Sequence, residues 1–142
     1  MSINKLRAER AIRSAKRELM NGLKSFDEGD YTGALKYLQE CSEYAVKAIL
    51  IAYAVDYPRI HGVGRFLIEN RGRFPEWFGS KIDVISEVVD TLARNRPRFR
   101  YPYEYPPEEH KAFAEGIRLK VKELFTNCDR LIDELFGEDR SR

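Results

Sequence analysis

Residues 29–50 read GDYTGALKYLQECSEYAVKAIL, and their pattern is the strongest indication of the fold. Small and apolar side chains recur in and just beyond it at alternating spacings of four and three, which places them on one face of an α-helix. This row comprises Ala34, Leu38, Cys41, Ala45, Ala48 and Ala52. A second apolar row lies beside the first and comprises Leu35, Val46, Ile49 and Tyr53. So wide an apolar face predicts a central helix, from residue 31 to about residue 54, that touches several neighbours.

The sequence on both sides of this helix has the same helical periodicity. Asp30 is expected to cap the N-terminus of the central helix, and the helix before it is the natural antiparallel partner across a short turn. Pro107, Glu108 and Glu109 are a strong start signal for a last helix, and Gly137 is expected to end it. Together with the central helix, the pattern predicts an all-α, five-helix protein, a single domain over residues 1–142. The four other helices span about residues 4–26, 63–70, 75–95 and 106–136.

Charge is balanced along most of the chain. The sequence has 25 Lys and Arg against 23 Asp and Glu, for a formal net charge of +2, which is too small to indicate a general nucleic-acid binder. Hydrophobic residues make up 43% and charged residues 34%, a composition typical of a globular protein. Acidic residues thin out only around residues 94–103, so local clustering is more informative than the total.

Residues 94–105, RNRPRFRYPYEY, form an arginine–tyrosine segment in that basic region. Its prolines, with the two that follow, argue against a regular helix, so an extended segment with its arginines pointing in broadly one direction is expected. Arginine binds phosphate bidentately, and tyrosine offers a face on which a base can stack. A phosphate-bearing ligand is therefore predicted here; a dimer contact and a solvated loop are the alternatives. The predicted phosphate-binding residues are Arg96, Arg98, Arg100 and Tyr101.

The sequence offers little sign of a metal or disulfide site. Cys41 and Cys128 lie far apart on apolar helix faces, where packing is the expected role. With two histidines and no CxxC motif, neither a metal site nor a cofactor is predicted. The N-terminal segment lacks an apolar core and no stretch approaches the length of a membrane span, so a cytoplasmic protein without a membrane partner is expected.

The chain resembles the HEPN-domain family over nearly its whole length. The matching residues are Gly29, Asp30, Tyr31, Ala34, Gln39, Glu43, Lys47, Ala48, His61 and the run Arg100, Tyr101 and Pro102. The resemblance implies an up-and-down helical bundle, usually a homodimer. It also implies binding of nucleotides or nucleic acid, or action beside a small nucleotidyltransferase in a toxin–antitoxin module. Many members are metal-independent ribonucleases marked by an arginine, four to six residues and a histidine.

Here nine residues separate Arg100 from His110, so the spacing of the ribonuclease motif is absent. His110 lies in the first turn of the last helix, where the helix dipole favours a neutral imidazole. Such an imidazole can accept a proton from a ribose hydroxyl while Arg100 or Arg98 stabilises charge on the phosphate. A solvent-facing histidine without a catalytic role is the alternative.

Four further positions carry predictions: Glu43, Lys47, His61 and Trp77. Glu43 and Lys47 form an i,i+4 pair that is either a surface salt bridge or part of a binding groove, and Lys47 is included among the predicted phosphate ligands. His61 is expected to cap or pack at the start of the third helix. Trp77 is expected to close a hydrophobic corner or, if exposed, to mark a contact surface.

The sequence therefore favours a homodimeric HEPN-like module that binds a nucleotide or RNA and acts with a small nucleotidyltransferase. The first alternative is a metal-independent endoribonuclease that uses Arg100 and His110. The second alternative is an interaction scaffold with no ligand of its own.

Overall fold

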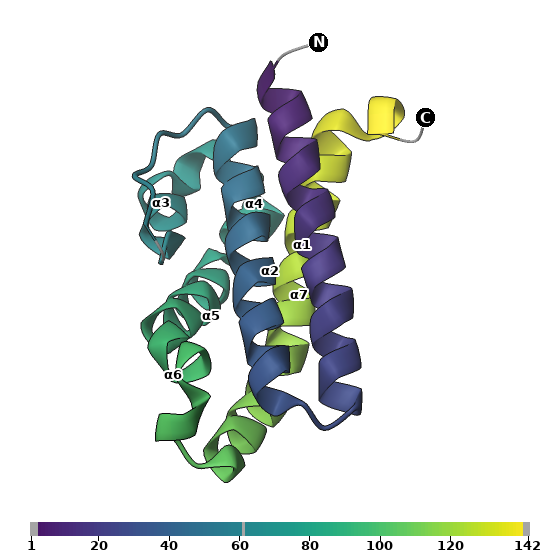
Figure 1. Ribbon diagram of the computed structural model, residues 1–142. Helices are drawn as coiled ribbons and strands as arrows, with labels where there is room; N and C mark the ends of the chain where they lie inside the picture. The colour runs from purple at the N-terminus through teal and green to yellow at the C-terminus, as the bar shows by residue number, and fades with distance from the viewer. Residues whose placement is uncertain (1–2, 61, 141–142) are drawn as a thin grey trace.

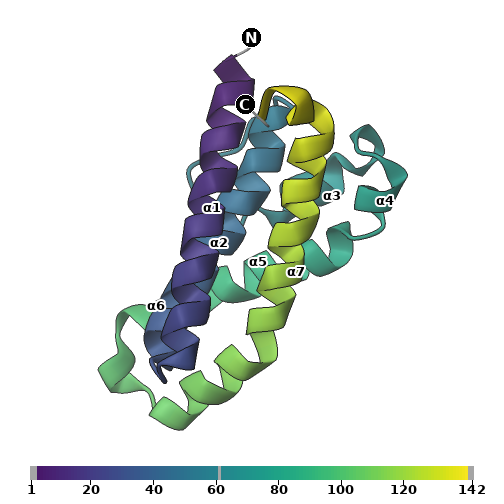
Figure 2. The same ribbon diagram turned by 90° about the vertical axis from the view of Figure 1, so that its right-hand side faces the viewer.

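The central helix predicted from the sequence is α2 (Tyr31–Ala52), and the rest of the molecule is arranged around it. The structure is a computed structural model that describes residues 3–60 and 62–140; no strand occurs in those ranges. Helix α1 (Ile3–Asp27) runs antiparallel to α2, and the long last helix α7 (Pro107–Arg140) packs against both (Figures 1 and 2). The first row of small residues in α2 is buried from Ala34 to Ala48, and its last member, Ala52, is partly buried. These three helices therefore form the principal layer of an all-α bundle.

The turn between α1 and α2 has the predicted cap. The Oδ1 atom of Asp30 accepts a hydrogen bond of 2.9 Å from the backbone N–H of Gly33, which is otherwise unpaired in the first turn of α2. Gly29 precedes the cap with a φ of +81°, a conformation that glycine adopts without steric cost. This tight turn brings α1 back alongside α2.

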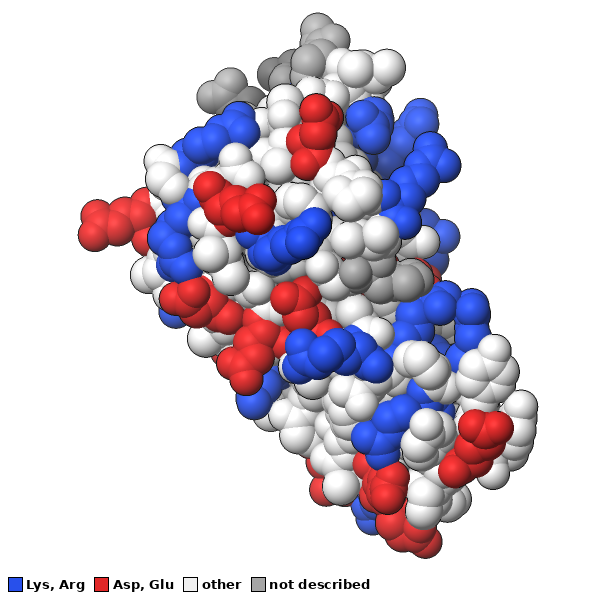
Figure 3. All heavy atoms as spheres, turned by 90° about the vertical axis from the view of Figure 1, so that its left-hand side faces the viewer, with Lys and Arg blue, Asp and Glu red and all other residues white. Residues whose placement is uncertain are grey.

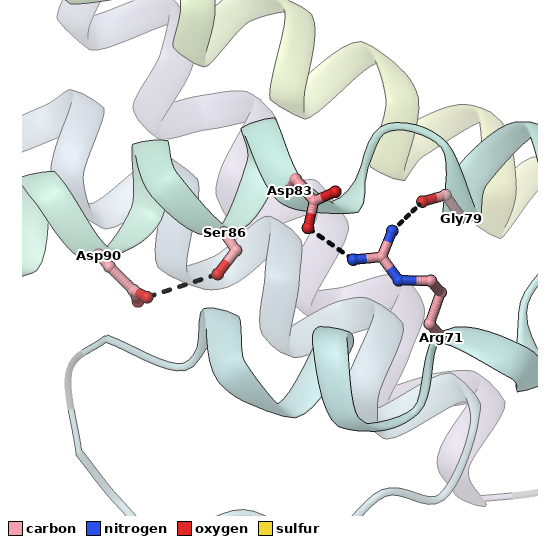
Figure 4. A network of polar contacts seen from close by, with 5 residues as sticks. All are labelled: Arg71, Gly79, Asp83, Ser86 and Asp90. Carbon is pink, nitrogen blue, oxygen red and sulfur yellow. Dashed lines mark hydrogen bonds and ion pairs between the residues drawn. The ribbon is translucent and has the colours of Figure 1, made fainter.

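Shorter helices cover the other side of α2: α3 (Gly64–Glu69), α4 (Glu76–Gly79) and α5 (Ile82–Arg94), with the 3₁₀ turn η1 (Arg71–Arg73) between the first two. The single helix predicted over residues 75–95 is wrong, because α4 ends at Gly79 and α5 begins at Ile82. Arg71 explains the break: its Nη1 donates a 2.8 Å hydrogen bond to the carbonyl of Gly79, and its Nη2 pairs with Asp83 at 2.5 Å (Figure 4). The guanidinium thus satisfies a carbonyl at the end of α4 and holds the start of α5 beside it.

The arginine–tyrosine segment is helical where an extended conformation was predicted. It forms α6 (Arg96–Arg100) and the 3₁₀ turn η2 (Pro102–Glu104). Pro97 lies in the first turn of α6, where its missing N–H leaves no bond unmade and its φ suits the helix. Helix α6 ends before Tyr101, the residue that precedes Pro102. The prolines therefore set the helix boundaries without excluding a helix.

The last helix is longer than predicted. It starts at Pro107, within one residue of the predicted start, but continues through Gly137 to Arg140. A glycine inside a helix costs about 1 kcal/mol relative to alanine, which a long packed helix can bear. The predicted count of five helices is also wrong, since the described residues form seven α-helices and two 3₁₀ turns.

The core lies between α1, α2, α5 and α7 and contains both cysteines as free thiols. Burial raises the pKa of the Cys41 thiol and of the Cys128 thiol, so packing is their role, as predicted. Within residues 3–60 and 62–140 there is no group of three metal-ligating His, Cys, Asp or Glu residues. No helix of the described chain has the length and apolar character that crossing a membrane requires.

Trp77 is half-buried at the end of the bundle where α4 meets α7. Its ring packs edge-on against Phe78, and its Nε1 donates a 3.1 Å hydrogen bond to Glu134. The Arg130 guanidinium lies 3.8 Å from the ring centroid. Trp77 therefore closes a corner of the bundle, as expected, although polar partners from α7 complete the contact.

Candidate functional site

Helix α6 separates the arginines that the extended prediction placed together. Because Arg96 and Arg100 are four residues apart, they share one face of α6, whereas Arg98 lies on another. Arg96 and Arg100 line a pocket of about 290 Å³ between α1, α2 and α6. The other lining residues are Glu18, Lys36, Tyr37, Gln39, Glu40 and Phe99.

Three cations in this pocket lack partners. Lys36, Arg96 and Arg100 form no hydrogen bond or ion pair within the described part of the chain. Some other basic side chains are paired, including Arg71 with Asp83 and Arg98 with Glu109, whereas others among the described residues, such as Arg10 and Arg13, form no ion pair. Basic side chains are also numerous on the face formed by α3, α5 and α6 (Figure 3). The pocket therefore presents unpaired positive charge on an otherwise nearly neutral protein, a feature that favours an anionic ligand.

Two carboxylates line the same pocket without pairing to those cations. Glu18 from α1 and Glu40 from α2 are partly buried, and neither forms an ion pair among the described residues. Burial, with a further contribution from the Glu40 charge, raises the pKa of Glu18 above its usual value. The pocket therefore has an acidic side as well as a basic one.

Gln39 is a buried polar residue at this pocket. Its side chain is 2% exposed, and its Nε2 has no hydrogen-bond partner in the described structure. Leaving a buried donor unpaired costs about 1–3 kcal/mol, so such groups are rare and need an explanation. The Nε2 atom is itself buried, so a ligand in the pocket would reach it only after the side chain moved.

Three of the predicted phosphate ligands, Arg98, Tyr101 and Lys47, lie outside the lining of this pocket. Tyr101 is 46% exposed and packs edge-on against Tyr103, with ring centroids 6.3 Å apart. Lys47 lies further along α2, where its Nζ is 3.6 Å from a Glu43 carboxylate oxygen and 6.0 Å from the Tyr57 ring centroid. The i,i+4 salt bridge at Glu43 and Lys47 is therefore present and is separate from the pocket. The predicted role of His61 falls outside the described residues.

His110 is buried, not solvent-facing. It is 2% exposed, and its Nδ1 lies 2.7 Å from the hydroxyl oxygen of Thr32 at the start of α2. The rings of Phe99 and Tyr105 are its aromatic neighbours, and its Nε2 is buried without a partner. Burial lowers the pKa of His110, as does the Arg98 charge, while Glu109 opposes them. The imidazole is therefore held in its neutral form.

Arg98, rather than Arg100, is the arginine associated with His110. Its Nη2 pairs with Glu109 at 2.5 Å, its Nη1 donates to Asn95 at 3.3 Å, and its guanidinium lies 5.0 Å from the Tyr105 ring centroid. In the described residues, no hydrogen bond or ring contact joins Arg100 to His110. A catalytic role for Arg100 and His110 stays a prediction.

Sequence reasoning missed most of the pocket. Glu18, Lys36 and Glu40 resemble ordinary residues on solvated helix faces, and only the packing of α6 against α2 brings them to the arginines. Gln39 did carry a signal, since it is a polar residue adjacent to the apolar row that contains Leu38. An amide at the edge of a buried face is a candidate ligand contact even before the partner helix is known.

Comparison with protein-family models matches residues 8–133 to the HEPN domain. Comparisons with curated proteins and with solved structures found no match. The family match spans most of the chain and agrees with the all-helical architecture and with the motifs around α2 and α6. The chain belongs to the HEPN-domain family.

Proposed function

We propose that this HEPN-domain protein binds a nucleotide, free or within RNA, in the pocket between α1, α2 and α6. The observation that supports this proposal is the group of three unpartnered cations, Lys36, Arg96 and Arg100, around one pocket. Two guanidinium groups one helical turn apart can both bind phosphate oxygens, and the lysine adds a point charge. A volume of about 290 Å³ is at the lower end for small-ligand sites, so it suits one nucleotide.

Calorimetric titration of the purified protein with nucleoside 5′-monophosphates and a short single-stranded RNA tests this proposal. We expect Arg96→Ala/Arg100→Ala to weaken binding about tenfold or more, and affinity to fall as salt rises from about 50 to about 200 mM. Arg10→Ala/Arg13→Ala is the matched control, since it removes two exposed α1 arginines that do not line the pocket. Equal affinity in the pocket double variant and the control would contradict the proposal.

A second candidate function is metal-independent RNA cleavage at His110. The supporting observation is a neutral imidazole whose Nε2 is unpaired and whose pKa is lowered in part by the Arg98 charge. At 2% exposure, however, Nε2 would need α6 and η2 to move before RNA could reach it. Binding is therefore the better-supported function. Cleavage of RNA in EDTA that His110→Ala abolishes would support the enzyme, and a wild-type protein without cleavage would exclude it.

The homodimer and the nucleotidyltransferase partner of a toxin–antitoxin module are further proposals that rest on family membership. Light scattering after size-exclusion chromatography should give twice the 16.6 kDa chain mass. Co-expression with a nucleotidyltransferase encoded beside it should yield a stable complex. A monomer, or a partner that does not co-purify, would contradict the respective proposal, and co-purification without nucleotide binding would favour a scaffold.

A further inference from the structure

The nucleotide pocket contains hydrogen-bonding groups that a phosphate alone would not use. Its cations suffice for phosphate, yet Glu18 and Glu40 also line it without ion pairs among the described residues. We propose that these two carboxylates make the pocket selective for guanine among the four RNA bases. This inference rests on the proposed function, because it identifies the base of the nucleotide whose phosphate the cations hold.

Two unpaired carboxylates restrict the bases that fit. An ionised carboxylate only accepts hydrogen bonds, and its two oxygens are best satisfied by two adjacent donors. The Watson–Crick edge of guanine offers that pair, N1–H and N2–H₂. Adenine, cytosine and uracil each place an acceptor beside a single donor on that edge, which would face a carboxylate oxygen unfavourably. A glutamate that accepts hydrogen bonds from guanine N1–H and N2–H₂ would explain why a pocket that binds phosphate also contains carboxylates.

The apolar part of the pocket suits a flat ring. Tyr37 is 36% exposed and Phe99 is 1% exposed, and both line the pocket. An exposed phenol ring can stack on a base, which contributes about 1–3 kcal/mol regardless of base identity. Stacking therefore supplies affinity, and Glu18 and Glu40 supply selectivity.

The two glutamates repel each other, which is consistent with a site whose ligand donates hydrogen bonds to one of them. The Glu40 charge helps to raise the pKa of Glu18, so the two carboxylates destabilise each other in the free protein. A ligand that donates two hydrogen bonds to one of them offsets part of that cost. The cations on α6 and Lys36 would at the same time hold the phosphate.

Calorimetric titration of the wild-type chain with GMP, IMP, AMP, CMP and UMP tests this inference without a variant. We expect GMP to bind about tenfold or more tightly than AMP, CMP and UMP, because one bidentate pair discriminates by about 1–3 kcal/mol. IMP lacks the N2 amine but keeps N1–H and O6, so its affinity should lie between those of GMP and AMP. A tetraribonucleotide with one internal guanosine and its adenosine analogue distinguish an RNA ligand from a free nucleotide.

Glu18→Gln and Glu40→Gln identify the carboxylate. At least one of them should reduce the GMP-to-AMP affinity ratio toward one, while affinity for AMP is kept or raised because negative charge is removed near phosphate. Glu87→Gln, which makes the same change at an exposed α5 carboxylate outside the pocket, should leave the ratio unchanged. Circular dichroism of each variant confirms that it is folded.

The outcomes separate the two proposals. Equal affinities for all five nucleotides, or a preference for AMP, would overturn guanine selectivity while nucleotide binding stands. A GMP preference that survives in both glutamate variants would also overturn it, since the stated groups would not be responsible. If no nucleotide binds and Arg96→Ala/Arg100→Ala changes nothing, the proposed function itself fails.

Discussion

His110 is a titratable side chain held against two aromatic rings and a threonine hydroxyl. The Nδ1 atom of its imidazole lies 2.7 Å from the Thr32 hydroxyl oxygen. A protonated, positively charged imidazolium would be repelled by the nearby Arg98 guanidinium. Asp30 likewise acts through a single contact: its carboxylate accepts one hydrogen bond in the first turn of α2. Each of these interactions is therefore expected to have a measurable effect on stability.

The lowered pKa of His110 predicts a specific loss of stability in acid. The folded-state pKa lies below the ordinary value of 6.5, so on acidification the unfolded chain binds this proton first. The contribution of His110 to the free energy of unfolding is therefore present above about pH 6.5 and lost as pH falls through the folded pKa. Urea unfolding at pH 7.5 and pH 5.5 should show a larger loss for wild type than for His110→Gln. Parallel losses would contradict this assignment.

The cap at Asp30 predicts a modest, local effect. Asp30→Ala removes the acceptor for the Gly33 N–H and should lower the free energy of unfolding by about 1 kcal/mol. Glu28→Ala, an exposed neighbour in the same turn that has no capping role, is the control and should change stability by less than about 0.5 kcal/mol. Chemical denaturation measures both, and an equal effect of the two variants would refute the capping role.

Among the helices, α3 and α5 approach so closely that one position admits only glycine. A Cβ at Gly64 would lie 2.4 Å from the Ser86 hydroxyl oxygen and 2.8 Å from its Cα. The Gly64 N–H donates to Asp90 at 3.2 Å, and Ser86 makes a longer contact of 3.5 Å with the same carboxylate (Figure 4). These contacts hold α3 against α5.

Gly64→Ala is therefore expected to destabilise the protein by about 1–3 kcal/mol, because backbone atoms of α5 must move to accommodate the methyl group. Gly116→Ala is the matched control: Gly116 lies in α7, and a Cβ there would meet no atom within 4 Å. That substitution should stabilise by about 0.4–1 kcal/mol. Thermal unfolding of both variants measures the difference, and the same sign for both would contradict the close-packing argument.

Across the whole molecule, Phe99 links the pocket to the core. Its ring lines the pocket, lies 6.1 Å from the His110 ring and packs edge-on against Phe113 of α7 at 5.6 Å. Helix α6 has only five residues, so it cannot persist alone and depends on this anchor. The positions of Arg96 and Arg100 thus depend on packing with α2 and α7.

Phe99→Ala should reduce both stability and ligand affinity. The loss of a buried aromatic ring costs about 3–5 kcal/mol, and a loosened α6 no longer holds its two arginines at the pocket. Phe99→Leu preserves an apolar anchor and should have smaller effects on both quantities. Denaturant unfolding and GMP titration on the same samples provide the test. Normal affinity in a folded Phe99→Ala protein would show that α6 is positioned by other contacts.

The sequence predicts the helices of this protein better than it predicts the residues of the candidate site. The core rows of α2, the Asp30 cap and the start of α7 follow from periodicity and start signals, which are local properties. The break between α4 and α5 was missed because Arg71, outside the predicted helix, binds the Gly79 carbonyl. The helix at residues 96–100 was missed because the prolines were taken to exclude a helix, although Pro97 falls where a helix tolerates one.

Periodicity and motifs are sufficient to predict the helical class, the central helix, the family and the region that holds the arginines. Which arginines share a pocket depends on the tertiary structure, because the five-residue helix α6 places Arg96 and Arg100 in the pocket lining and Arg98 beside Glu109. The tertiary structure also decided that His110 is buried and that Glu18, Lys36, Gln39 and Glu40 share the pocket. The physical reason is range: periodicity and caps act within a few residues, whereas a pocket joins side chains from helices far apart in the chain.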